Sequence, residues 1–371
     1  MCSCASWRAC ARGSSPGIRR RRRRRAFRMK HHLGGGTMRS LLCVLASLIA
    51  GAAFAQQPLK IRVAYVVPVA NWASLIFEKP GLARHQGKSY TFEAVHFQGT
   101  PQMITALANN ELEIADLAFA SLAIAVQNAG MDDLRVIADE FQDGVEGYYT
   151  DEFFVLKDSA VKTVRDLKGK VVATNVAGSA VDIIMRAMLR KNGLDDRKEV
   201  NTIETAFPNM KPTLLSKKAD VIPGVIPFSF DPELRAATRV LFTQKEVVGR
   251  TQMIVWAARA GVIQKNRAAM VDFMEDTIRA VRWYLDAANH KEAVEIAARV
   301  SKRPAAAFDK WLFTKNGQNG DYYRDPDMKP DLKALQANID LQHELGLVKA
   351  TIDVAKHAEL GIIEEAAKRL K

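Results

Sequence analysis

The residues best suited to chemistry are small polar residues at four places where a predicted strand gives way to a predicted helix. These junctions are Asn71-Trp72, Gly99-Thr100, Ala120-Ser121 and Gly178-Ser179. In an open α/β sheet they lie at the carboxyl ends of the strands, where ligands bind. Each helix start offers unpaired N–H groups and the positive end of the helix dipole. The sequence therefore predicts a site for a polar or anionic group, unless the hydroxyls serve only as helix caps.

Apolar residues beside these junctions could form the walls of such a site. Trp72 could stack on a ligand or belong to the core, and Phe207 follows a predicted strand in the second half of the chain. We therefore take ten residues as ligand-binding candidates: Pro68, Asn71, Trp72, Gly99, Thr100, Ser121, Gly178, Ser179, Phe207 and Asn209.

Signatures of catalysis and metal binding are missing from the sequence. It contains no Gly-x-Ser-x-Gly, no phosphate-binding Gly-x-x-x-x-Gly-Lys-Ser/Thr loop and no His-Glu-x-x-His. No two histidines beyond residue 56 stand at metal-ligand spacing. All four cysteines precede residue 56: Cys2, Cys4, Cys10 and Cys43. We expect no catalytic residue, no metal site and no cofactor.

Strands and helices alternate through the first half of the chain. Strands are predicted at 60–68, 90–97 and 114–119, with helices at 102–109 and 122–129, a pattern typical of a parallel sheet. A second unit of the same kind begins near Asp158. It includes an amphipathic helix after Gly178-Ser179 and strands at 171–174, 201–205 and 219–225. A strand at 253–257 follows, and the rest of the chain is mostly helical.

These elements predict an α/β protein with two lobes, the second inserted into the first, and a helical C-terminal tail. We expect residues 56–157 plus 250–371 to form lobe I and residues 158–249 to form lobe II. The chain would cross between the lobes near 156–159 and 247–252.

Basic charge is concentrated before residue 56. Twelve of the 54 lysines and arginines lie in 1–55, where there is no acidic residue, which leaves 42 basic against 41 acidic residues in 56–371. Twelve of the 13 net positive charges therefore belong to the N-terminal extension, and the rest of the chain is nearly neutral. The sequence does not favour nucleic-acid binding by the folded part.

The same extension carries the features of an export signal. Arg39 precedes an apolar run at 41–50, and Ala53-Phe54-Ala55 is a small-x-small cleavage motif. We expect cleavage near Ala55, a periplasmic location, and a translation start at Met29 or Met38. The arginine run at 19–25 leaves open the twin-arginine export route.

Four phrases resemble the substrate-binding proteins of ABC importers, in the nitrate/sulfonate/taurine and thiamine-precursor class. They are the strand 61–67 with Pro68, NNELEIADLAF at 109–119, DLKGKVVA at 166–173 before Gly178-Ser179, and KADVIPGVIP at 218–227. The resemblance implies a type II periplasmic binding fold that closes about a hinge on a small-molecule ligand. It also implies a monomer that delivers its ligand to a membrane ABC permease with a cytoplasmic ATPase.

Two other functions stay open. The first is an enzyme, because the family includes a pyrimidine synthase that uses a cysteine-rich motif. No cysteine follows Cys43 in this chain, and this absence disfavours the enzyme. A sensor module that reports ligand occupancy to a membrane receptor would have the same sequence features. At Gly224-Val225-Ile226-Pro227 relatives often carry an aromatic or acidic residue, so the ligand is not identified by resemblance.

The mature protein is expected to begin at Gln56. Intact-mass analysis of protein purified from the periplasm would then give the mass of residues 56–371, because signal peptidase cleaves after small-x-small motifs. A mass that retains residues 1–37 would contradict this processing.

Overall fold

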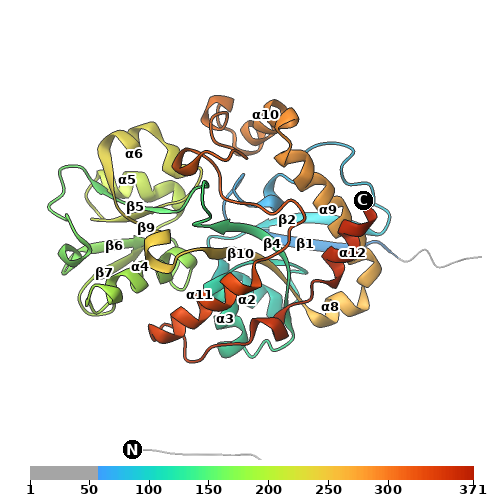
Figure 1. The fold of residues 1–371 in the computed structure, drawn as a ribbon, viewed down its shortest axis with the longest axis horizontal. Coiled ribbons are helices and arrows are strands. Elements are labelled where there is room, and N and C mark those ends of the chain that lie inside the picture. Colours follow the sequence, from blue (N-terminus) through green and yellow to red (C-terminus); the bar gives the residue numbers. More distant parts are fainter. Residues whose placement is uncertain (1–56) are drawn as a thin grey trace, which may run out of the picture. The chain divides into compact units, whose positions relative to one another are not determined.

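The computed structural model describes residues 57–371, in which two groups of strands are flanked by helices (Figure 1). The predicted start sites, the apolar run at 41–50 and the cleavage motif ending at Ala55 lie outside the described residues. Among the residues that are described, no helix combines the length and the apolar character that a bilayer crossing requires.

The first group of strands contains two sheets. Strands β1 (Leu59–Tyr65) and β2 (Tyr90–His96) pair in parallel. Strand β10 (Thr251–Arg259) lies between β3 (Ala115–Ala118) and β4 (Leu134–Asp143), antiparallel to both. A parallel bridge between Val63 and Ile114 connects the β1–β2 sheet to the entry of β3. Helices α2 (Thr100–Ala108) and α3 (Phe119–Asn128) complete the alternation that the sequence predicts.

The second group of strands is built in a similar way and is separate from the first (Figure 1). Strand β5 (Glu152–Leu156) lies between β8 (Ile222–Gly224) and β9 (Thr238–Thr243), antiparallel to both. Strands β6 (Val171–Thr174) and β7 (Asn201–Glu204) pair in parallel. The helices of this group are α4 (Ala180–Lys191), α5 (Met210–Leu215), α6 (Pro232–Ala237) and α7 (Gln244–Val248).

The predicted α/β, two-lobed fold is confirmed, and so is the parallel pairing of its alternating strands: β1 pairs in parallel with β2, and β6 pairs in parallel with β7. The sequence pattern does not predict that β5 and β10 join the two groups as antiparallel strands. Strands β10 and β5 run antiparallel to their neighbours because each follows a crossing between the two groups and enters its sheet from the opposite end. The helix predicted from Asn71 is only a 3₁₀ turn, Trp72–Ser74. The helical tail contains α8 (Ala260–Lys265), α9 (Arg267–Leu285), α10 (His290–Ser301), α11 (Leu332–Glu344) and α12 (Gly361–Arg369).

The lobe boundaries at 157/158 and 249/250 stay a prediction. Strand β5 is hydrogen-bonded only to strands of the second group, so the sheet pairing favours a first boundary before Glu152. The second crossing, between α7 and β10, falls at residues 249–250, within the predicted range.

A methyl group at Gly224 is expected to destabilise the second group of strands. A Cβ there would lie 2.1 Å from Cε2 of Phe154, which is itself buried in the core. We expect Gly224→Ala to lower the free energy of unfolding by about 1–3 kcal/mol. Gly261→Ala is the matched control, because a Cβ at that position in helix α8 would have no atom within 4 Å. Denaturant unfolding of both variants measures the difference; equal stabilities would contradict the close packing.

Candidate functional site

A cavity of about 60 Å³ lies between the two groups of strands. The first group supplies the loop after β1, the start of α2, and residues of β3, β4 and β10. The second group supplies the start of α4, the turn at Phe207 and the segment after β8. Tyr322, from the C-terminal part of the chain, completes the wall. Lining residues from both groups are what a site that opens and closes requires.

Four of the ten predicted site residues line this cavity: Asn71, Thr100, Ser179 and Phe207. Ser121 lies directly behind Thr100, since their hydroxyl oxygens are 2.6 Å apart and Ser121 is fully buried. The two predicted glycines lie where the groups meet. A Cβ on Gly99 would be 2.8 Å from Cγ2 of Val176, and one on Gly178 would be 3.6 Å from Cδ1 of Ile124.

The other three predicted residues lie elsewhere. Trp72 is buried in the core, where its ring stacks on Phe313 at 5.3 Å between centroids. Pro68 lines a neighbouring hollow of about 390 Å³. Asn209 is exposed and lines neither space. As ligand contacts, all ten residues stay predictions.

At the start of α4, some of the backbone N–H groups already donate hydrogen bonds within the protein. Ser179 is the N-cap, and its Oγ accepts a hydrogen bond from the N–H of Asp182 and donates to Oδ1 of Asn175 at 2.6 Å. The N–H of Gly178 donates to the Asp182 carboxylate. Helices leave their first N–H groups without intrahelical partners, so those of Ala180 and Val181, at the cavity wall, are the donors available there.

At the starts of α2 and α3, the N-cap is not the residue with the hydroxyl group. Gly99 is the N-cap of α2 and Ala118 that of α3, so Thr100 and Ser121 lie inside the first turns of their helices. Their hydroxyl groups bond to each other, which orients Thr100 at the cavity wall. The cap-only interpretation therefore fails for these two residues.

Two carboxylates that the sequence reasoning missed also line the cavity. Asp116 is 1% exposed, and neither of its carboxylate oxygens has a hydrogen-bond partner among the described residues. Oδ1 of Asp151 accepts a hydrogen bond from the hydroxyl of Tyr322 at 2.5 Å, while Oδ2 has none. The available signal was a single aspartate inside the apolar strand at 114–119.

More buried acids lie behind the cavity wall. Burial raises the pKa of Asp139, Glu140 and Asp143 to about 7. Burial, reinforced by the charge of Glu140, holds the pKa of Asp116 well above its usual range, and Arg324 partly opposes this. Arg324 is the one basic residue among the buried residues that the structure describes. The interior around the cavity is therefore acidic.

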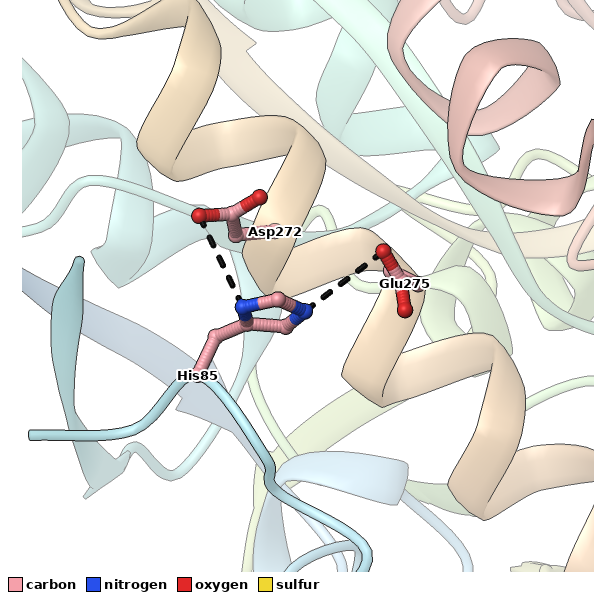
Figure 2. A group of neighbouring side chains, drawn as sticks. All are labelled: His85, Asp272 and Glu275. Carbon is pink, nitrogen blue, oxygen red and sulfur yellow. Dashed lines mark ion pairs between the residues drawn. The ribbon is translucent and has the colours of Figure 1, made fainter. Parts of the chain in front are cut away.

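A second group of titratable residues lies on the surface, where His85 faces helix α9 (Figure 2). Its ring nitrogens are 3.8 Å from an oxygen of Asp272 and 3.5 Å from one of Glu275. Arg369 approaches Asp272 at 2.9 Å and Arg279 approaches Glu275 at 2.5 Å. Because guanidinium groups already neutralise both carboxylates, this arrangement is better described as an ion-pair network than as a metal site.

A model of the NMT1-like family matches residues 55–298 of the chain. No curated protein sequence gives a significant match. Many solved structures share the fold.

Three solved structures define the similarity. The alkanesulfonate-binding protein SsuA from Xanthomonas axonopodis pv. citri, bound to MOPS, has a TM-score of 0.63 at 19% identity, covering 82% of this chain and 100% of that one. The periplasmic nitrate-binding protein NrtA from Synechocystis PCC 6803 has a TM-score of 0.65 at 15% identity, and the match covers 85% of this chain and 89% of that one. The desulfurization enzyme DSZB has 0.56 at 13%, covering 84% and 100%. At these identities the likeness shows the fold alone.

The buried acids predict a pH dependence of stability in the ligand-free protein. Asp139, Glu140 and Asp143 have pKa values near 7 when folded, above those of unfolded carboxyl groups. The folded state therefore binds more protons, and stability falls as pH rises from about 4.5 to about 7. We expect a melting temperature roughly 5 °C higher at pH 5.5 than at pH 8.

Glu140→Gln removes one of these ionisations and keeps an oxygen that accepts the hydrogen bond from the Trp72 N–H. The melting temperature of this variant should therefore fall less steeply with pH than that of the wild type. Glu344→Gln, on the exposed end of α11, is the control that leaves the slope unchanged. A melting temperature that rises with pH across this window would overturn the account.

Proposed function

Because the chain belongs to the NMT1-like family, we propose that it binds a small polar or anionic organic solute between its lobes and delivers it to an ABC permease. The solute-binding proteins that share its fold support this role. The single observation that carries the proposal is the cavity whose walls come from both groups of strands. No catalytic step is required, since capture and release follow from opening and closing.

The two crossings between the groups would act as the hinge. Gly144 and Gly249 lie one on each crossing, and both have a positive φ, +72° and +69°. A Cβ on Gly144 would lie only 2.8 Å from the carbonyl oxygen of Gly249, so the crossings run in close contact. A few residues at such crossings can absorb the backbone rotation of lobe closure. We place the hinge here.

The ligand's polar or anionic group would lie at the start of α4. The free N–H groups of Ala180 and Val181 and the hydroxyl of Ser179 are at the cavity wall. Fixed N–H dipoles at a helix start favour an anion without a charged side chain. That chemistry suits the sulfonate and nitrate named for the structural relatives, as well as other oxygen-rich groups.

The neighbouring hollow would be the entrance. It shares Val66, Val67 and Phe207 with the cavity, so the two spaces adjoin. Lys302 and Arg303 lie at its edge and would raise the local concentration of anionic solutes.

The partners follow from the role. We propose a periplasmic monomer that meets a membrane permease coupled to a cytoplasmic ATPase. The match to DSZB shows that an enzyme can have this fold, but no arrangement of nucleophile and base is found among the described residues of the cavity. A sensory role would use the same binding event and the same cavity.

The test is a thermal-shift screen of the purified protein against alkanesulfonates, nitrate, bicarbonate, pyrimidines and aromatic acids. A compound that binds only the folded state raises the melting temperature. Small-angle scattering with that compound should show a smaller radius of gyration, as expected for lobe closure. If no compound stabilises the protein, the binding role is wrong.

Substitution of Ser179 tests the position of the anion. We expect Ser179→Asp to weaken binding of a stabilising anion at least tenfold, because it adds a negative charge to the helix start. Ser179→Ala should cost about 0.5–1.5 kcal/mol of binding free energy, because the Ser179 hydroxyl caps α4 and bonds to Asn175 and so positions the N–H groups of the helix start. Ser216→Asp, at the exposed C-terminal end of α5, is the control. Titration calorimetry decides: unchanged affinity of Ser179→Asp means that Ser179 is only a cap.

A further inference from the structure

Asp116 gives the cavity a second polar subsite. We propose that the cavity selects a solute with an organic ammonium group and that the carboxylate of Asp116 binds this group. The proposal rests on the solute-binding function above and narrows the class of solute. It adds an acceptor on the lobe I side of the cavity to the donors at the start of α4.

The geometry of Asp116 is the first reason. The residue lies on the short strand β3, where all four residues are buried, and it lines the cavity. Both carboxylate oxygens are buried and have no hydrogen-bond partner among the described residues. Leaving a carboxylate in this state costs stability, and a ligand that donates hydrogen bonds to it removes that cost.

The surrounding charges are the second reason. Asp116 and Asp151 both line the cavity, whereas no lysine, arginine or histidine is found among the described residues that line it. Behind the wall, Glu140 adds a further acidic group. Arg324, behind the wall, offsets part of this negative charge: its Nη2 donates to the carbonyl oxygen of Ala70, its Nε lies 3.5 Å from Asp321, and its Nε and Nη1 have no hydrogen-bond partner among the described residues. One guanidinium group does not balance the carboxyl groups of Asp116, Asp151 and Glu140. The cavity therefore favours positive charge.

The apolar walls are the third reason, because they decide which kind of cation fits. The rings of Phe141 and Tyr322 stack at 4.3 Å and both line the cavity, beside Ile226 and Met253. Aromatic faces attract organic cations, whereas Ca²⁺ and Mg²⁺ need several oxygen ligands or bound waters. Such walls suit the carbon frame of an amine better than a hydrated metal ion.

Together with the start of α4, Asp116 would hold the two ends of one solute. An ammonium group would meet the carboxylate on β3, and an anionic or hydrogen-bond-accepting group would meet the N–H groups of Ala180 and Val181. The two subsites come from different lobes, so a solute with both groups would join the lobes when they close.

The test compares molecules that differ only in the amine. Taurine is paired with ethanesulfonate, β-alanine with propionate, and benzylamine with benzyl alcohol, each titrated up to 20 mM at pH 8 into the wild-type protein. We expect at least one amine to bind tenfold more tightly than its partner, by calorimetry and thermal shift. Sodium, potassium and magnesium chlorides form the inorganic arm and should not reproduce the effect.

The variant Asp116→Asn provides the second measurement. It keeps the shape of the side chain and removes the charge, so it should lose the tenfold preference for the amine. It should also melt at the same temperature as the wild type or higher, because an unpartnered buried carboxylate is gone. Asp309→Asn, an exposed aspartate in the tail, is the matched control.

The results separate this proposal from the proposed function. If the amine-free molecules bind and the amines show no preference, the ammonium subsite is wrong and solute binding stands. An unchanged preference in Asp116→Asn assigns the amine to another group and also overturns the proposal. If no molecule of any pair binds the wild type, the ammonium subsite is overturned. Solute binding itself is overturned only if the broader thermal-shift screen also finds no compound that stabilises the protein. Should Asp116→Asn fail to fold, the wild-type pairs alone decide.

Discussion

The burial of several carboxylates around one guanidinium group is the constraint on which the rest of the structure depends. Nη2 of Arg324 donates to the carbonyl oxygen of Ala70, and the guanidinium lies 4.7 Å from the ring centroid of Trp72. The N–H of Trp72 donates to Glu140 on β4, and the N–H of Asp325 donates to Asp139 on the same strand. The loop after β1, strand β4 and a segment almost 200 residues later are thereby fixed together, which sets the floor of the cavity.

The same acidic interior extends into the first crossing between the lobes. Asp143 lies at the start of that crossing. Its carboxylate accepts hydrogen bonds from the hydroxyl of Thr150 and the N–H of Asp151, which lie at the end of the crossing. The hydroxyl oxygen of Thr150 in turn accepts the N–H of Lys245, close to the second crossing. Because Asp151 also lines the cavity, a group that binds there would act on the hydrogen bonds of the proposed hinge. Binding and closure can be coupled through these few contacts.

The sequence predicts the parts of this molecule that depend on local pattern and fails where distant segments decide. Alternation places β1, β2, α2 and α3, and for α4 the sequence also gives the N-cap, Ser179, which is confirmed. The direction of β10 is not a local property, because an apolar run reads the same in a parallel or antiparallel sheet. Trp72 is in the core because Phe313 and Arg324 cover it, and neither is near it in sequence. Asp116 was missed for the same reason, since its burial depends on the packing of β3 against β10 and α2.

A cavity with donors on one lobe and an acceptor on the other gains specificity from the groups that a wrong solute leaves unpaired. A solute without a donor leaves the Asp116 carboxylate buried and unpartnered when the lobes close, and a solute without an acceptor does the same to the N–H groups of α4. Discrimination of this kind is stronger than that of an apolar pocket, which distinguishes solutes only by size. In the proposed open state this cost would be avoided, because water would reach both lobes. In the proposed role, the unpaired carboxylate would make closure depend on the solute, and a permease could then distinguish the loaded protein from the empty one.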